Sequence, residues 1–184
     1  LSIRRQRQMC IRDRFYDEDA DSGTAVDTTI SRNTVTVGGE SIAERVPKYS
    51  MNIANADNGT SLGVSSYHQV STRIYGVDQL QGESVVLSFD AKSDISKVVY
   101  VCAHQYFGTG GSPSTSVYTT GGTTAGRSTM TTAYGTRLSQ TISIPSITSK
   151  TLGSNNDDYL EIIISLQHGS TRASTIADVG GALV

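Results

Sequence analysis

Strict alternation of apolar and polar residues is the feature that most limits what this chain can fold into. From position 85 to 92 the odd-numbered residues are all apolar and the even-numbered ones mostly polar: Val85, Leu87, Phe89 and Ala91 against Val86, Ser88, Asp90 and Lys92. A period of two places these sets on opposite faces of an extended strand, with one face in water. Nowhere do apolar residues recur at helical spacing over three turns, so the pattern predicts strands.

Three other long runs also predict strands. Residues 67–75 alternate, and residues 158–167 place Leu160, Ile162 and Ile164 on one side. Residues 97–107 hold consecutive apolar side chains at positions 98–101, which is typical of a central strand buried on both faces. We expect shorter strands at 33–37, 48–54, 116–120, 137–144 and 173–179.

Clusters of turn residues separate these runs and set the fold class. Pairs such as Asn58-Gly59 and Gly121-Gly122 break the chain between strands, and the Thr-rich stretch 119–132 reads as a long exposed loop. Eight or nine strands without helices between them predict an all-β fold, an antiparallel two-sheet β-sandwich. A jelly roll is the preferred topology.

One N-terminal segment is set apart from the fold. Residues 4–14, which read RRQRQMCIRDR, resemble the translation of a transposase adapter used to build DNA libraries. The alternative is a genuine basic arm that binds nucleic acid or a membrane surface. We exclude residues 1–14 as adapter-derived and expect residues 15–184 to form a single β-sandwich domain, part of a longer chain.

Removing that segment changes the charge and the cysteine count. Residues 4–14 carry five arginines and one aspartate, so the formal net charge of −2 becomes −6 for the remainder. An acidic domain argues against a nucleic-acid partner, because phosphate binding needs a basic patch. Cys102 is then alone in an apolar run and is predicted to be a buried free thiol. No apolar stretch approaches the ~20 residues of a membrane span, so we expect no membrane insertion.

The loop that follows the predicted central strand has an unusual composition. Positions 105–114 read QYFGTGGSPS. The loop lacks the lysine of a phosphate-binding loop and is not followed by a predicted helix whose N-terminus could hold an anion. We therefore interpret it as a structural turn whose glycines allow positive φ and close backbone approach.

Several segments, in their order along the chain, resemble a jelly-roll module of bacteriophage tail-fibre and other virion proteins. They are residues 47–51, 73–77, 85–92, 105–114, 150–153, 158–161 and 176–179. The resemblance spans residues 15–179. It departs at the end, where the family has a Gln-Leu-Glu-like sequence and this chain reads GGALV over 180–184.

The resemblance implies a function and a set of partners. Such modules are similar to carbohydrate-binding sandwiches, which implies a non-catalytic role in attaching an extracellular virion to glycans on the host surface. Other virion subunits would be partners, and a homotrimer is implied. Two other functions stay open: a carbohydrate-binding module of a secreted glycoside hydrolase, and a purely structural virion domain.

Polar side chains on two predicted strands are the candidate ligand-binding residues. Sugars are recognised by aromatic faces together with planar hydrogen-bonding groups. Side chains of these types share one face of each strand: Tyr67, Gln69 and Arg73 on the first, and Tyr159, Glu161 and Gln167 on the second. If the two strands are neighbours, the six residues would form a groove. An ordinary solvent-exposed sheet face would show the same alternation.

The usual sequence marks of catalysis are absent, and we expect neither an enzyme nor a cofactor. Cys102 and His104 share a strand face, but no second cysteine and no carboxylate at ligand spacing accompanies them. No Gly-x-Ser-x-Gly nucleophile elbow occurs. A Ser/His/Asp triad stays open, because triads are assembled in space rather than in sequence.

An acidic run near the N-terminus approaches the pattern of a calcium loop. Residues 17–23 read DEDADSG, with alternate carboxylates suited to a hard cation. Glycine comes one position late, and the twelfth position is Thr28 instead of glutamate. A solvated acidic loop is the preferred interpretation, and a structural calcium ion is the alternative.

Overall fold

The computed structural model describes residues 16–20, 27–34, 49–56, 63–133 and 137–183. The predicted adapter-derived segment, residues 1–14, lies outside these ranges. The elements are β1 (Tyr16–Ala20), β2 (Asp27–Thr34), β3 (Tyr49–Ala56), β4 (Tyr67–Tyr75), β5 (Ser84–Phe89), β6 (Lys97–Tyr106), β7 (Val117–Thr120), η1 (Thr123–Gly126), β8 (Arg127–Met130), β9 (Leu138–Ser143), β10 (Tyr159–His168) and α2 (Ser170–Thr175).

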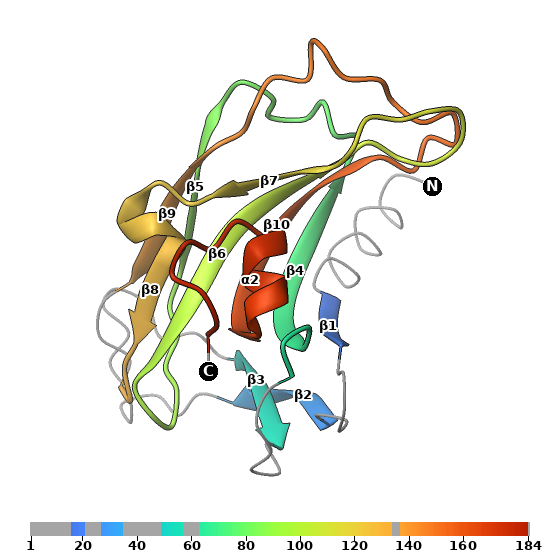
Figure 1. The fold of residues 1–184 in the computed structure, drawn as a ribbon. Helices are drawn as coiled ribbons and strands as arrows, with labels where there is room; N and C mark the ends of the chain where they lie inside the picture. Colours follow the sequence, from blue (N-terminus) through green and yellow to red (C-terminus); the bar gives the residue numbers. More distant parts are fainter. Residues whose placement is uncertain (1–15, 21–26, 35–48, 57–62, 134–136, 184) are drawn as a thin grey trace, which may run out of the picture.

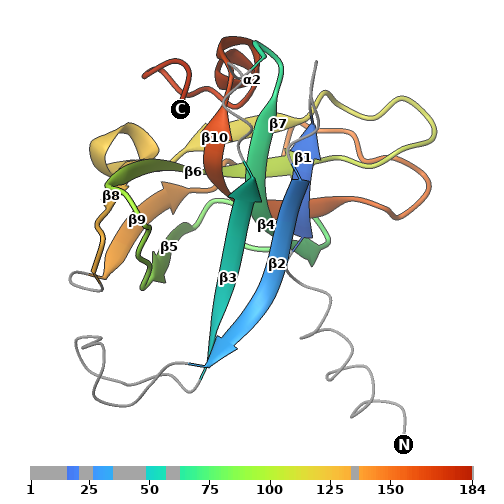
Figure 2. The same cartoon turned by 90° about the horizontal axis from the view of Figure 1, so that it is seen from below.

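The strands form one large antiparallel sheet and two small ones (Figure 1). The large sheet has the order β1-β4-β10-β6-β7, and β8 also pairs with β6. Strands β5 and β9 form a second sheet, and β2 and β3 form a third, which lies below the large sheet in Figure 1 and in front of it in Figure 2. The predicted all-β, antiparallel sandwich is confirmed, whereas the jelly-roll connection stays a prediction.

The main core lies between the large sheet and the β5-β9 sheet. From the large sheet, β6 and β10 bury Val101, Ala103, Leu160 and Ile162 against Ile142 of β9 and Ile144. The odd-numbered residues of β5 (Val85, Leu87, Phe89) pack onto the same cluster, while Val86 is 63% exposed. The alternation in this segment therefore predicted its inner and outer faces correctly.

The opposite face of the large sheet is covered at one end by the C-terminal segment. Tyr100, Cys102 and Ile163 pack there against Ile176 and Leu183. Helix α2 lies in front of β4, β10 and β6 in Figure 1. A bridge between His168 and Leu183 ties the end of the chain back to β10. Strand β6 is thus buried on both faces, as its apolar run predicted.

The predicted strand at 173–179 is wrong. Residues 170–175 form α2, and the chain then turns. Ala173 in this short helix and Ile176 just after it, three positions apart, are both buried. A helix of six residues is too short for helical periodicity to stand out from the sequence.

Two further expectations from the sequence are also wrong. The stretch 119–132 is not a single exposed loop, because β8 within it pairs with β6 and buries Met130. Residues 17–20 of the predicted acidic loop lie in β1 and pair with β4. Part of the predicted strand at 33–37 belongs to β2, and positions 35–37 lie outside the described ranges.

The glycine-rich loop after β6 is a structural turn, as predicted. Gly108, Gly110 and Gly111 all have positive φ, at 83°, 79° and 67°. The loop pairs with residues 153–157: Gly153 N donates to Phe107 O at 2.7 Å, and the Asp157 carboxylate accepts from Thr109 N at 2.7 Å. Its polar groups are therefore used to hold two loops together.

We expect Gly153→Ala to lower the free energy of unfolding by about 3 kcal/mol, as overpacked sites do. A Cβ at Gly153 would lie 2.6 Å from the backbone nitrogen of Thr109, which cannot move without breaking the paired loops. Gly111→Ala is the control, because a Cβ there meets nothing within 4 Å and costs only the left-handed strain of about 1–2 kcal/mol. Urea unfolding compares the two, and equal costs would contradict the close approach.

Candidate functional site

Five tyrosines that are not fully buried lie, among the described side chains, on the side of the large sheet that faces away from the main core. Tyr75, Tyr159 and Tyr106 stand directly opposite one another on the adjacent strands β4, β10 and β6. Tyr118 of β7 pairs with His104, and Tyr67 starts β4 on the same face. We call these five residues and the polar side chains between them the tyrosine face. None of the five is fully buried, and Tyr75 is 70% exposed.

The aromatic rings of this face contact each other and two guanidinium groups. The rings of Tyr106 and Tyr159 stack with centroids 4.8 Å apart, and Arg73 Cζ lies 4.6 Å from the centre of Tyr159. At the other end, Arg172 Cζ lies 4.3 Å from the centre of Tyr67. Such contacts hold planar groups in fixed orientations.

Glu161 is the centre of the polar network under the rings. It is 3% exposed and accepts hydrogen bonds from Ser71 Oγ at 2.7 Å and Arg73 Nε at 2.9 Å. His104 Nδ1 lies 3.2 Å from its other oxygen. Burial would raise the pKa of Glu161, but the bonds from His104 and Ser71 and the charge of Arg73 outweigh it and lower the pKa. Glu161 is therefore an ionised carboxylate that holds the side chains of Ser71, Arg73 and His104 in place.

His104 lies between this network and the rings. Its ring stacks on Tyr118 with centroids 4.2 Å apart and planes 5° from parallel. A carboxylate only accepts, so His104 Nδ1 carries the proton toward Glu161. His104 Nε2 is buried and has no hydrogen-bond partner among the described residues. In the neutral ring this nitrogen is an acceptor for a hydroxyl group.

The structure places five of the six predicted ligand residues on the tyrosine face, and their role in binding stays a prediction. The strands β4 and β10 are neighbours, and Arg73 stands opposite Glu161. Tyr67, Arg73 and Tyr159 are partly exposed on the tyrosine face. Gln69 and Glu161 lie on that face but are buried, so they position the arginines instead of offering an open surface.

Gln167 is not on the tyrosine face, and its predicted placement is wrong. The register of β10 against β4 shifts between Ser165 and Gln167, so that Gln167 stands opposite His68. Because His68 alternates with Gln69, the shift moves Gln167 to the other side of the sheet. A bulge of this kind leaves no mark in an alternating sequence.

The predicted ligand residues did not include Tyr75, Tyr106, Tyr118 or Arg172. Tyr75 and Tyr106 lie in strands that the sequence predicted, but only the register shows that they flank Tyr159. Tyr118 joins them through the pairing of β7 with β6. Arg172 comes from α2, which the sequence did not predict, and its Nη2 donates to Gln69 Oε1 at 2.7 Å.

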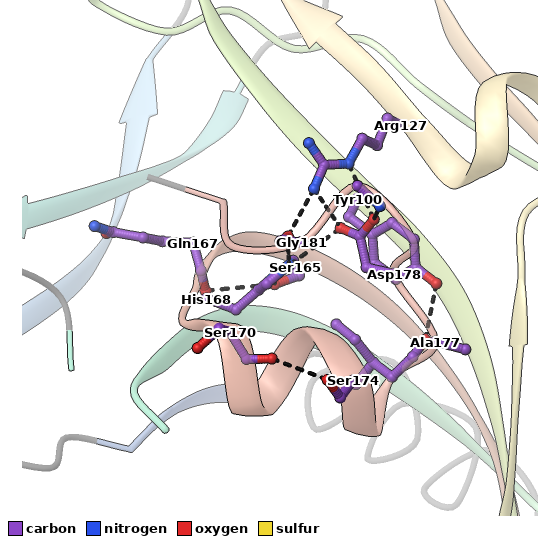
Figure 3. Close-up of polar contacts among 12 residues, drawn as sticks. Tyr100, Arg127, Ser165, Gln167, His168, Ser170, Ser174, Ala177, Asp178 and Gly181 are labelled. Carbon is purple, nitrogen blue, oxygen red and sulfur yellow. Dashed lines mark hydrogen bonds and ion pairs between the residues drawn. The ribbon is translucent and has the colours of Figure 1, made fainter. Parts of the chain in front are cut away.

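A second polar cluster lies beneath the C-terminal segment. Figure 3 shows Ser165, His168, Asp178 and Arg127 connected by hydrogen bonds and ion pairs. Ser165 Oγ is 2.8 Å from His168 Nδ1, and His168 Nε2 is 3.1 Å from Asp178 Oδ2. Nε2 faces only acceptors and carries the proton, so Nδ1 accepts from the serine hydroxyl. The order of groups is that of a Ser/His/Asp triad, but the two ring nitrogens are exchanged, because the triad places Nε2 on the serine and Nδ1 on the aspartate.

The burial of this cluster favours a structural role. Ser165 and His168 are both 0% exposed, and a nucleophile must reach its substrate. Arg127 donates to both oxygens of Asp178 and to Gly181 O, and Tyr100 Oη donates to Ile176 O at 2.8 Å. These bonds fasten residues 176–181 to β6 and β8. We call the cluster the C-terminal clamp.

The C-terminal clamp makes stability depend on pH. Burial lowers the pKa of His168 below its ordinary 6.5, although the neighbouring Asp178 opposes this. The unfolded chain therefore binds the proton first as pH falls, so this contribution is complete above about pH 6.5 and is lost below it. We expect urea unfolding at pH 5.5 to give a lower free energy than at pH 7.5, and His168→Gln to reduce that difference. Equal pH dependence in both proteins would contradict this assignment.

Metal-ligand groups and the free cysteine are the other places where chemistry could occur. Among the described residues, no group of three or more His, Cys, Asp or Glu side chains could hold a metal ion. Asp17, Glu18 and Asp19 lie in β1, and a strand does not wrap around an ion as a calcium loop does. Cys102 is the buried free thiol that the sequence predicted, and burial raises its pKa to about 12. Within the described ranges, no helix is long and apolar enough to cross a membrane.

Comparison with protein-family models, curated proteins and solved structures finds no match for this chain. The tyrosine face must therefore be interpreted from its own chemistry. The resemblance to virion modules stays a prediction from the sequence.

Proposed function

We propose that this chain is a non-catalytic carbohydrate-binding module and that the tyrosine face is its binding site. The observation that carries the proposal is the row of Tyr75, Tyr159 and Tyr106 across three adjacent strands. The apolar face of a pyranose ring packs on aromatic rings, and its hydroxyl groups bond to planar polar side chains at their edges. Arg73, beside Tyr159, supplies such a group.

The network below the rings supports binding by pre-organisation. Arg73 is held by its ion pair with Glu161 and by its contact over the ring of Tyr159. Its guanidinium therefore loses little freedom when a ligand binds. Glu161 is itself fixed by Ser71 and His104. A shallow face of this kind gives weak single-site affinity, which multivalent display raises by orders of magnitude.

The proposed setting is the virion of a bacteriophage. The resemblance of the ordered segments to tail-fibre modules supports attachment to host-surface glycans, with other virion subunits and a homotrimer as partners. A carbohydrate-binding module of a secreted glycoside hydrolase would use the same face. Genes for tail and baseplate proteins beside the coding sequence would favour the virion, and a hydrolase domain in the same reading frame would contradict it.

A glycan array tests the proposed function. The 184-residue chain, labelled and clustered on a multivalent support, is expected to bind a limited set of oligosaccharides and to lose that binding when Tyr75 and Tyr159 are replaced. A clustered protein that binds no glycan at all would leave the purely structural virion domain as the better explanation.

A further inference from the structure

Among the side chains that the structure describes, Arg172 has no acidic partner, which distinguishes it from three other arginines. Arg73, Arg127 and Arg137 pair with Glu161, Asp178 and Asp90 at 2.9, 3.0 and 3.1 Å. No carboxylate among the described residues forms an ion pair with Arg172, whose Nη2 donates to the neutral amide of Gln69. A partly buried guanidinium without a counter-ion is unfavourable, because its desolvation is not offset by an opposite charge.

The position of Arg172 connects this charge to the tyrosine face. Helix α2 carries it over the sheet, where Cζ lies 4.3 Å from the centre of the Tyr67 ring and 5.8 Å from that of Tyr118. The ring of His104 stacks on Tyr118 as well. Arg172 and His104 are therefore both next to Tyr118, which lies on the edge strand β7.

Two polar atoms at this place have no partner among the side chains that the structure describes. Arg172 Nε and His104 Nε2 are both buried, and neither forms a hydrogen bond with a described residue. Most buried polar atoms in native proteins are paired, so two exceptions beside one ring indicate groups whose partner comes from outside the chain. Arginine N–H groups donate, and an imidazole Nε2 either accepts from a hydroxyl group or donates to an oxygen, so a ligand with both acidic oxygens and hydroxyl groups matches the pair.

The local charge also favours an anion. Glu161 is the acidic side chain between Arg73 and His104, and it already accepts from Ser71, Arg73 and His104. Its oxygens are therefore already used by these neighbours, and the charge of Arg172 is left for a ligand to offset. The chain as a whole has a formal net charge of −2, so binding of an anion here would depend on this guanidinium.

We infer that the ligand of the tyrosine face is an acidic glycan, with a carboxylate or sulfate group that Arg172 binds. The inference rests on the proposed function, because it names the class of sugar that the same face takes. A guanidinium recognises carboxylate and sulfate oxygens with charge-assisted, often bidentate hydrogen bonds. The sugar rings would lie along the row of Tyr75, Tyr159 and Tyr106, and Arg172 would bind the acidic group of the charged sugar.

Matched pairs of oligosaccharides that differ only by one carboxylate or sulfate group test this inference. We expect the acidic member to bind at least about tenfold more tightly at low salt, a difference of about 1.4 kcal/mol. In Arg172→Gln the ratio of acidic to neutral affinity should fall to about one, and Arg172→Lys should restore part of it. Arg137→Gln removes an exposed arginine elsewhere and should leave the ratio unchanged.

The outcomes separate the inference from the proposed function. Equal binding of acidic and neutral members, or an unchanged preference in a folded Arg172→Gln protein, overturns the inference and leaves the proposed function in place. Absence of binding to either member overturns both. Thermal melting shows whether each variant is folded, and increasing salt should weaken the preference for the acidic member.

Discussion

Arg127→Ala is expected to lower the free energy of unfolding by about 3–4 kcal/mol. Arg127 donates to both carboxylate oxygens of Asp178 at 3.0 Å and to Gly181 O at 2.7 Å. The side chain of Asp178 is 0% exposed, so the substitution leaves a buried carboxylate without its main counter-ion. Breaking a buried pair in this way costs about 3–5 kcal/mol, and the lower part of that range applies because His168 remains beside Asp178.

Arg137→Ala is the matched control for this prediction. Arg137 also pairs with an aspartate, Asp90, but its own side chain is 60% exposed. Exposed pairs contribute about 0–1 kcal/mol, so this variant should unfold almost like the parent protein. Chemical denaturation of all three proteins at one pH gives the comparison. Similar losses in the two variants would show that residues 176–181 are not fastened by the C-terminal clamp.

The double variant Tyr75→Ala, Tyr159→Ala is expected to reduce glycan affinity by about 100-fold. Burial of about 60 Å² of apolar surface on Tyr75 is worth about 1.5 kcal/mol, or tenfold in affinity. Tyr159→Ala is expected to cost about as much, because it removes the ring on which Arg73 stacks. Tyr75 is 70% exposed, so its removal should change stability very little. Loss of binding in the single variant Tyr75→Ala would therefore reflect a lost contact with the ligand instead of a loss of folding.

Val86→Ala provides the control for the tyrosine variants. Val86 is 63% exposed on the outer face of β5, on the sheet that packs against the other side of β6 and β10. Its removal takes away exposed apolar surface without touching the tyrosine face. Affinity measured by biolayer interferometry should be the same as for the parent protein. A loss equal to that of Tyr75→Ala would indicate non-specific adhesion.

The sequence predicted the parts of this fold that depend on period-two alternation. The inner face of β5, the doubly buried β6 and the bounds of β4 agree with the structure. The same pattern placed Tyr67, Arg73 and Tyr159 on one surface, because β4 and β10 turned out to be neighbours. Alternation predicts which residues share a face of one strand, and the pairing of neighbouring strands brings those faces together on one surface.

The parts that failed depend on interactions between distant segments. The bulge in β10 that moves Gln167 is visible only in its register against β4. Helix α2 forms where Ala173 and Ile176 become buried, although its sequence has no helical stripe long enough to recognise. The triad-like order of Ser165, His168 and Asp178 depends on the turn of the C-terminal segment.

Nuclear magnetic resonance of the isotopically labelled chain during titration with the best array glycan tests the central claim most directly. We predict saturable chemical-shift changes centred on Arg73, Tyr75, Tyr106, Tyr159 and Arg172, with residues of β5 and β9 unchanged. Shift changes centred on the β5-β9 sheet, or no saturable change at millimolar glycan, would contradict the assignment of the tyrosine face as the binding site.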